Sequence, residues 1–191
     1  MRHGNHKANV LTPETVAMCR ATGEALKATG LEIDMVVSSP AGRAVETALE
    51  TLHGYGTMVY VRTNDLLADT DISPESAEAV KKAQIQAAGL ISNGEEALAE
   101  VLLDPKGEFA ELMSGRGAEG NTCLVEIAAD NPGKTVLAPS HGIARIENTI
   151  QALRDEELHK PRLVKNCQIV ELILDSSTSS LIEENWLDIA V

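Results

Sequence analysis

The sequence predicts an α/β fold, specifically a three-layer α/β/α sandwich around a largely parallel central sheet. Short apolar runs rich in β-branched residues, typical of strands buried on both faces, alternate along the chain with segments that carry helix start signals. A chain of 191 residues is long enough for one domain with a substantial core. No linker, repeat or low-complexity segment divides it. We therefore expect residues 1–191 to form a single domain.

The first half of the chain shows this alternation directly. A hydroxyl, a proline and an acid at Thr12-Pro13-Glu14 are typical of a helix start, and Gly30 is expected to end that helix. The elements expected next are a strand at 33–38, a helix from Pro40 to Gly54, a strand at 57–61 and a polar loop at 64–73.

The middle of the chain, at about 75–130, is predicted to be a helical insertion that covers one end of the sheet and shapes the mouth of a site. Prolines and glycines divide it into four pieces, which are expected to begin at Pro74, at Asn93, near Phe109 and at Asn121. The stretch 115–120 fits the pattern GxGxxG, but it follows a helix and not a strand. We interpret it as a mobile loop and not as a dinucleotide site.

The last third of the chain returns to the alternating pattern. An apolar run at 135–138 predicts another buried strand, and the segment from Gly142 to Leu153 predicts the helix that follows it. Two alternating runs at 167–174 and 180–187, joined by a Ser/Thr-rich turn, predict a hairpin.

Charge and composition exclude several classes of partner. The chain has 16 Lys and Arg against 29 Asp and Glu, a net charge of −13, which argues against nucleic acid and anionic membranes. It has no apolar run of about 18 residues and no signal-peptide pattern, so we expect a cytoplasmic protein.

The cysteines and three of the histidines are not expected to belong to a site. The distant Cys19, Cys123 and Cys167 are expected to be buried free thiols, and His6, His53 and His159 are expected to face solvent.

Three short stretches bring two arginines and two histidines to turns. Arg2-His3-Gly4 opens the chain, Arg43 follows the first predicted strand, and Ser140-His141-Gly142 follows the strand at 135–138. Open α/β sheets bind ligands at the carboxyl ends of their strands, where helix N-termini supply backbone donors. Guanidinium groups match phosphate oxygens, and a histidine nitrogen can attack phosphorus. Together the stretches predict a phosphoryl site.

In this order the stretches resemble the histidine phosphatase superfamily, which includes the cofactor-dependent phosphoglycerate mutases. The resemblance covers most of the chain outside the helical middle and implies a phosphoglycerate-mutase-like fold. The residues that carry it are Arg2-His3-Gly4, Asn9, Leu11-Thr12-Pro13, the run 38–48 around Arg43, Ser140-His141-Gly142 and Asn166-Cys167-Gln168-Ile169.

The resemblance also implies roles for individual residues. His3 would be the nucleophile that becomes phosphorylated, and Arg2, Arg43 and His141 would hold the phosphoryl oxygens. Asn9 and Gly142 are expected to add hydrogen bonds to the phosphate. The general acid is expected at Asp69, in Leu67-Ala68-Asp69, where many members of the family have Glu; Asp71 and Asp65 are its rivals.

The activity that these roles imply is hydrolysis of a phosphomonoester, or of protein phosphohistidine, through a phospho-His3 intermediate. The expected partner is a phosphorylated small molecule or a phosphoprotein. Phosphoglycerate mutase-type transfer is one alternative, and a phosphate-binding module without turnover is another. The sequence has no carboxylate cluster with metal-ligand spacing, so we expect neither a metal nor another cofactor.

One departure from the resemblance lies at the start of the chain. The family has a buried strand immediately before Arg-His-Gly, whereas here only Met1 precedes the motif. Unpaired backbone groups inside a buried sheet are costly, so we expect one of two outcomes. Either the sheet is split or narrowed, with His3 displaced from Arg43 and His141, or another segment, such as one from a partner chain, fills the position and the protein is a homo-oligomer.

Overall fold

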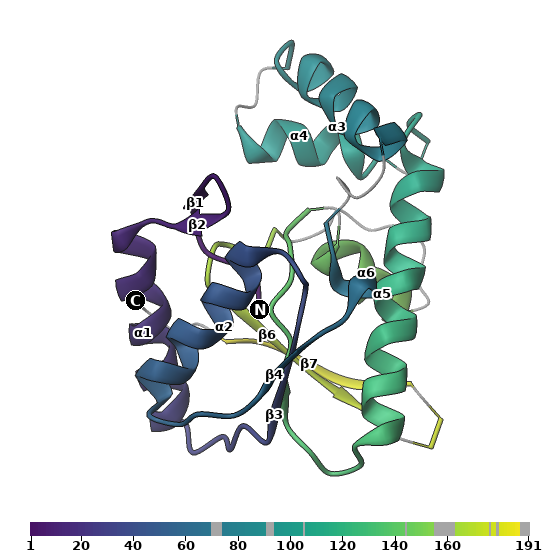
Figure 1. The fold of residues 1–191 in the computed structure, drawn as a ribbon. Helices are drawn as coiled ribbons and strands as arrows, with labels where there is room; N and C mark the ends of the chain where they lie inside the picture. The colour runs from purple at the N-terminus through teal and green to yellow at the C-terminus, as the bar shows by residue number, and fades with distance from the viewer. Residues whose placement is uncertain are drawn as a thin grey trace.

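The computed structural model describes residues 1–69, 74–90, 94–104, 106–143, 145–154, 163–175, 177–178 and 180–187. Its centre is a parallel sheet of three strands in the order β4-β3-β5, with helices on both faces (Figure 1). The predicted three-layer α/β architecture is therefore confirmed. The strands are β3 (Met35–Ser38), β4 (Val61–Thr63) and β5 (Val136–Leu137).

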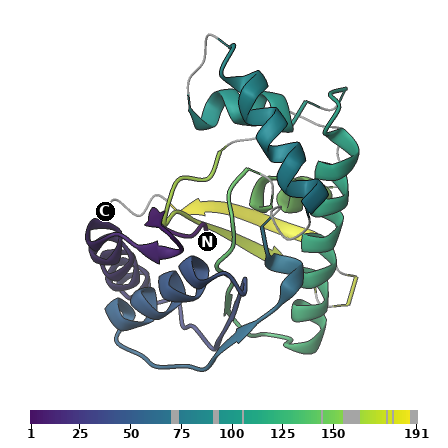
Figure 2. The same ribbon diagram turned by 45° about the horizontal axis from the view of Figure 1, so that its top comes forward.

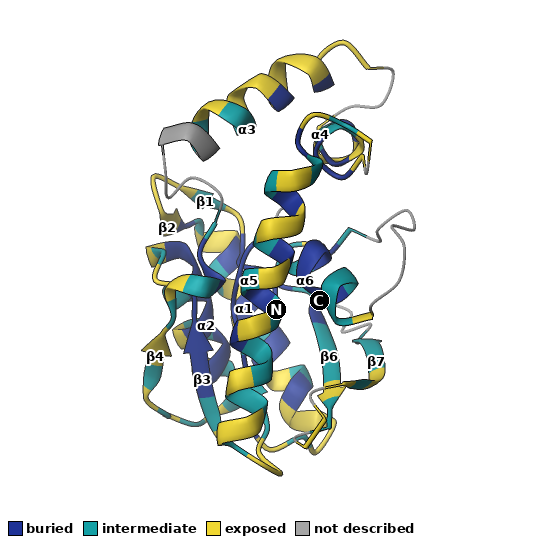
Figure 3. Ribbon diagram, turned by 90° about the vertical axis from the view of Figure 1, so that its right-hand side faces the viewer, coloured by how far each residue is buried: buried dark blue, intermediate teal, exposed yellow. Residues whose placement is uncertain are grey.

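Strand β3 is the middle of this sheet and is almost entirely buried (Figure 3). Its Val36 pairs with Val61 on one side and with Leu137 on the other. The neighbouring strand β4 begins later than the predicted strand at 57–61, because Met58 and Tyr60 are about 80% exposed and lie outside the sheet. The predicted loop that follows contains a short 3-10 helix, η1 (Asp65–Leu67).

Helices α1 (Pro13–Ala28) and α2 (Gly42–Tyr55) form one outer layer. The side chain of Thr12 caps α1 as expected, accepting a hydrogen bond from the backbone N–H of Thr15 at 3.3 Å. Helix α2 runs past Gly54, where the sequence predicts its end, and stops at Gly56 with a φ of 79°. Gly54 lies inside the helix and allows close packing against α1, since a side chain there would overlap the backbone of Arg20.

Helices α5 (Ala110–Asp130) and α6 (Ile146–Arg154) form the opposite layer. The predictions of a helix start at Asn121 and of a loop at 115–120 are wrong, because both lie inside the single helix α5. The glycines serve helix packing instead. A Cβ on Gly117 would lie 2.6 Å from the carbonyl oxygen of Asn148 on α6, and one on Gly120 would overlap Thr149.

Helices α3 (Pro74–Ala87) and α4 (Glu95–Leu102) pack against each other beyond the ends of the strands, as the predicted helical insertion requires (Figure 2). Their apolar contacts form a separate cluster that includes Ala83, Leu102 and Phe109. This cluster also contains Ile143, which follows β5 and His141, so the helical pair is anchored next to the strand ends.

The remaining strands form two separate hairpins. The predicted C-terminal hairpin is confirmed as β6 (Ile169–Leu174) and β7 (Leu181–Leu187), which pair only with each other among the described strands. A second, unpredicted hairpin joins β1 (His6–Lys7) to β2 (Val10–Leu11). The predicted split of the central sheet is therefore observed.

The first three residues lie between the two halves of this split sheet. Arg2 forms a parallel bridge with Ser140, just after β5. On its other side the backbone N–H of Arg2 donates to the carbonyl of Gln168 at 3.1 Å, and the N–H of Cys167 donates to the carbonyl of Arg2 at 3.1 Å. The start of the chain thus connects β5 to the segment that enters β6.

Candidate active site

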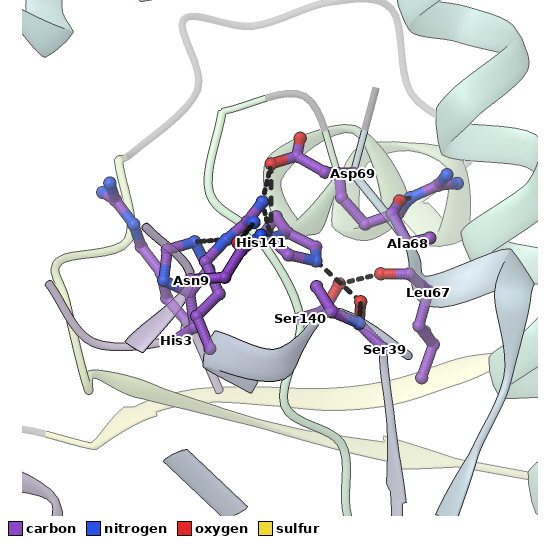
Figure 4. Close-up of polar contacts among 12 residues, drawn as sticks. His3, Asn9, Ser39, Leu67, Ala68, Asp69, Ser140 and His141 are labelled. Carbon is purple, nitrogen blue, oxygen red and sulfur yellow. Dashed lines mark hydrogen bonds and ion pairs between the residues drawn. The ribbon is translucent and has the colours of Figure 1, made fainter. Parts of the chain in front are cut away.

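Five of the predicted site residues meet at the ends of the strands (Figure 4). They come from four separate parts of the chain: the opening segment, the first turn of α2, the segment after η1 and the segment after β5. The five residues are His3, Asn9, Arg43, Asp69 and His141.

Arg43 holds this group together. Its buried guanidinium donates from Nε to His3 Nε2 at 3.2 Å and from Nη1 to Asn9 Oδ1 at 2.6 Å. Its Nη2 donates both to Asp69 Oδ2 at 2.6 Å and to His141 Nδ1 at 3.1 Å. One side chain therefore fixes the spacing of the predicted nucleophile, the predicted acid and the second histidine.

His3 presents an unprotonated ring nitrogen, Nε2, to Arg43. Its Nδ1 lies 2.7 Å from the carbonyl oxygen of Gly4, so the proton sits on Nδ1 and the lone pair on Nε2. Burial, and to a smaller extent the positive charge of Arg43, lowers the pKa of His3 to about 4. The imidazole is neutral near pH 7, the state in which its nitrogen can attack phosphorus.

His141 lies directly beside it, with 4.9 Å between the ring centroids. Its Nε2 is 2.7 Å from Ser39 Oγ, and burial lowers its pKa, so the neutral ring accepts from Arg43 at Nδ1 and donates to Ser39 from Nε2. The predicted displacement of His3 from Arg43 and His141 is wrong, because the backbone bonds of residues 1–3 to both flanking segments hold His3 in place.

Arg2 is turned away from this group, towards the helical pair α3–α4. Its Nη1 donates to Glu95 Oε2 at 2.9 Å and to the carbonyl of Val164 at 2.7 Å, and its Nη2 forms an ion pair with Glu95 Oε1. This contact lowers the pKa of Glu95. Gly142 lies against Arg2, since a Cβ there would come within 2.7 Å of Arg2 Nε.

The segment that carries Asp69 is held by Arg145, which the sequence did not indicate, and by Ser140 of the predicted stretch Ser140-His141-Gly142. The buried Arg145 donates from Nε to the carbonyl of Ala68 at 2.8 Å, and Ser140 Oγ donates to the carbonyl of Leu67 at 2.8 Å. Arg145 is itself paired with Glu119 of α5 at 3.1 Å. No spacing in the sequence marks Arg145, because its partners lie in two distant segments, the one after η1 and helix α5.

Thr47, which belongs to the run 38–48, connects two parts of the site through its hydroxyl group. Its hydroxyl donates to the carbonyl of Arg43 at 2.7 Å and accepts from the backbone N–H of Gly4 at 3.1 Å. The first turns of α2 are thereby tied to the segment that carries His3. This residue positions two members of the site without pointing into it.

The other predicted residues fall outside the group. Asp65, a rival of Asp69, is exposed at the start of η1, and Asp71 lies outside the described residues. His53 is exposed as expected, and His159 lies outside the described residues. The prediction for His6 is wrong: it is only partly exposed, because its ring packs 5.3 Å from that of His3.

Three further observations concern the described residues. The three cysteines are free and buried, as predicted. Within the described ranges, no group of three or more His, Cys, Asp or Glu side chains is arranged to hold a metal ion. No described helix combines the length and the apolar character needed to cross a membrane.

The profile of the histidine phosphatase superfamily (branch 1) matches residues 1–186. No curated protein sequence matches the chain. A phosphoglycerate mutase from Bacillus anthracis has a similar structure, with a TM-score of 0.65 at 23% identity over 99% of this chain and 91% of its own.

Two phosphatases also have a similar fold. A mycobacterial glucosyl-3-phosphoglycerate phosphatase superposes with a TM-score of 0.68 at 18% identity, over 97% of this chain and 93% of its own. The protein histidine phosphatase SixA, in complex with tungstate, superposes with a TM-score of 0.58 at 18% identity, over 97% and 92%.

Proposed function

Because the chain belongs to the histidine phosphatase superfamily, we propose that it is a phosphatase that hydrolyses a phosphomonoester or a protein phosphohistidine through a phosphohistidine at His3. The observation that carries the proposal is the contact of His3 Nε2 with the buried Arg43, next to His141. A neutral nucleophile is thus already in contact with a guanidinium fork that matches phosphoryl oxygens. The three free, buried cysteines support a cytoplasmic site of action.

The reaction proceeds in two balanced steps. In the first, His3 Nε2 forms a bond to phosphorus while the bond to the leaving oxygen breaks, and that oxygen takes a proton from Asp69. In the second, water attacks the phosphorus, gives a proton to Asp69, and the phosphorus–nitrogen bond breaks to release phosphate. Arg43 turns its N–H groups from Asp69 and the histidines to the phosphoryl oxygens, which carry the charge in both transition states.

The proposal is tested by incubating the purified protein with nitrophenyl phosphate, 3-phosphoglycerate and a phosphohistidine peptide. Release of inorganic phosphate in large excess over enzyme, from at least one of them, supports a phosphatase. Interconversion of phosphoglycerate isomers without phosphate release would replace the proposal with a mutase. Stoichiometric binding of phosphate without turnover of any substrate would replace it with a binding module.

Replacing Asp69 with asparagine should distinguish good from poor leaving groups. An alkoxide needs the proton that Asp69 supplies, whereas nitrophenolate leaves without one, so the rate on alkyl phosphates should fall by about 10²–10⁴-fold and the rate on nitrophenyl phosphate by far less. Asp65→Asn is the matched control on the same segment, where the carboxylate is exposed. If Asp69→Asn lowers the hydrolysis rate equally on both substrates, Asp69 is not the general acid.

The lowered pKa of His3 predicts an unusual pH profile. The neutral form persists down to about pH 4, so kcat/KM for nitrophenyl phosphate, corrected for substrate ionisation, should stay level between roughly pH 5 and pH 7 and fall only near pH 4. An unperturbed histidine would lose its neutral form near pH 6.5. A half-loss of rate near that value, with the fold intact by circular dichroism, would contradict the assignment.

The ion pair between Arg2 and Glu95 predicts competition with the bound anion. Phosphate that contacts Arg2 must displace the Glu95 carboxylate, so Glu95→Gln should tighten inhibition by phosphate or vanadate. Since the Glu95 side chain is 56% exposed and the pair is screened by water, we expect about a two- to fivefold effect. Glu96→Gln, an exposed neighbour on the same helix turn, is the control and should change nothing. Weaker inhibition in Glu95→Gln would show that the carboxylate helps anion binding.

A further inference from the structure

Two of the three buried cysteines lie in contact with each other. Cys19 belongs to α1, and Cys167 lies just before β6, 148 residues further along the chain. Both belong to the same apolar cluster, whereas Cys123 belongs to another. The two sulfur atoms are 3.4 Å apart, and a disulfide bond is about 2.05 Å long. They therefore need to approach by only about 1.3 Å to become bonded.

The backbone at Cys167 has a conformation that few residues with side chains adopt. Its φ is 60°, in the left-handed region that favours glycine. Strain of this kind persists only where the surroundings fix it, and it is concentrated at functional positions. Here the N–H of Cys167 donates to the carbonyl of Arg2 at 3.1 Å, and the thiol contacts that of Cys19. Both the backbone and the neighbouring thiol thus hold this cysteine in place.

The cysteine pair packs against the residue that orients His3. A Cβ on Gly4 would come 3.2 Å from Sγ of Cys167 and would overlap Cγ2 of Thr15, so Gly4 fits closely between α1 and the cysteine. The carbonyl of Gly4 fixes the Nδ1 proton of His3. A movement of Cys167 towards α1 narrows the space of Gly4 and displaces the carbonyl that aligns His3.

Cys167 is the more reactive thiol of the pair. It is 4% exposed, whereas Cys19 is fully buried. The hydrogen bond from Cys19, and to a smaller extent the positive charge of Arg2, lowers the pKa of Cys167, whereas the pKa of Cys19 is raised. The thiolate is the form that attacks an oxidant. Because so little of Cys167 reaches solvent, the oxidant must be small and uncharged, as hydrogen peroxide is.

We propose that Cys19 and Cys167 are a redox-sensitive pair, which hydrogen peroxide converts to a disulfide that lowers activity at His3. Disulfides in reducing compartments are usually transient and redox-sensing, and thiol reductants return them to thiols. The effect on the rate rests on the proposed function, whereas the cross-link itself does not.

The oxidation proceeds in two balanced steps. The Cys167 thiolate attacks one peroxide oxygen, the O–O bond breaks, and the departing hydroxide takes up the proton lost from the thiol, which leaves a sulfenic acid and water. The sulfur of Cys19 then attacks the sulfur of the sulfenic acid. The S–S bond forms as the S–O bond breaks, and the released hydroxide takes the Cys19 proton to give a second water.

The test treats the purified, reduced protein with hydrogen peroxide. Digestion without reductant should yield a peptide pair that links Cys19 to Cys167 and is lighter by two hydrogen atoms. The midpoint of thermal unfolding should rise by roughly 5–10 °C, because the bridge closes a long loop. Hydrolysis of nitrophenyl phosphate should fall at least about tenfold, since a reacting group displaced by about an ångström loses much of its rate, and dithiothreitol should restore it.

Cysteine variants separate the cross-link from other oxidation. Cys19→Ala should keep its basal rate, form no cross-link and resist peroxide, and Cys167→Ala should likewise form no cross-link. Cys123→Ala is the matched control, a buried thiol in another cluster, and should respond as the unaltered protein does. Sulfoxide on Met58, which is 80% exposed, shows that the dose of peroxide is sufficient.

Three results would overturn the proposal: no cross-link at a dose that oxidises Met58, a cross-linked protein with its full rate, or an equal and reversible loss of rate in Cys19→Ala. If the unaltered protein hydrolyses no substrate, the proposed function fails, and the cross-link, the unfolding midpoint and vanadate binding still test the pair. Cross-linking should then weaken vanadate binding, and unchanged binding would count against an effect on His3.

Discussion

Replacing His3 with alanine should lower phosphate release by about 10⁴-fold or more, because no other described side chain offers a nitrogen in the same position. His3 Nε2 already contacts Arg43, and its Nδ1 proton is fixed by the Gly4 carbonyl, so the nucleophile and its orientation are lost together. The measurement is steady-state hydrolysis of nitrophenyl phosphate. The covalent step is checked by acid-free quenching, which should trap a base-stable, acid-labile phosphate on the unaltered protein only.

The control for this experiment is His53→Ala, which removes an exposed histidine of α2 and should leave the rate unchanged. Full activity in His3→Ala would exclude a phospho-His3 intermediate. Loss of activity accompanied by trapped phosphate on a different residue would move the nucleophile to that residue.

Replacing Arg43 with lysine should cost about 10²–10³-fold in kcat, although the positive charge is kept. The guanidinium donates to four side chains at once, and a single ammonium on a flexible stem cannot reproduce that planar arrangement. Because the change removes transition-state contacts, kcat should fall more than KM rises.

Arg20→Lys is the matched control for Arg43→Lys. Arg20 also lies in a helix and pairs with a carboxylate, that of Glu50, but its side chain is about half exposed and the pair is distant from the site. Its replacement should change neither kcat nor the unfolding midpoint noticeably. If the Arg43→Lys protein keeps its fold and its full kcat, a positive charge at this position is enough for catalysis and the planar guanidinium geometry is not needed.

The part of the site that the sequence predicts is the part built on strand ends. Arg43 and His141 each follow a short apolar run, and the parallel pairing of β3 with β5 brings those two ends together. His3 joins them because the residues before it pair with Ser140 in the manner of a strand. Local pattern and sheet geometry agree at these positions, and the contacts show that the three side chains lie together.

The parts that the sequence does not predict depend on packing between distant elements. Gly117 and Gly120 look like loop residues, yet they lie inside α5 because α6 approaches at those positions. Glu95 reaches Arg2 only because α4 is folded over the strand ends, and the orientation of α4 is not encoded in its own periodicity. The same is true of Arg145, whose role follows from the carbonyl of Ala68 that happens to lie beside it.

Residues 1–3 connect the central sheet to the β6–β7 hairpin through backbone hydrogen bonds. Among the described residues, no strand of the sheet pairs with a strand of the hairpin. Residues 1–3 carry the backbone bonds to the segment before β6 and also position His3. Any fluctuation that detaches the β6–β7 hairpin must break the same bonds that align the nucleophile. We therefore expect local opening of this region to disrupt the proposed active site. Because local opening generally costs less free energy than global unfolding, the protein should lose activity on warming before its helices melt.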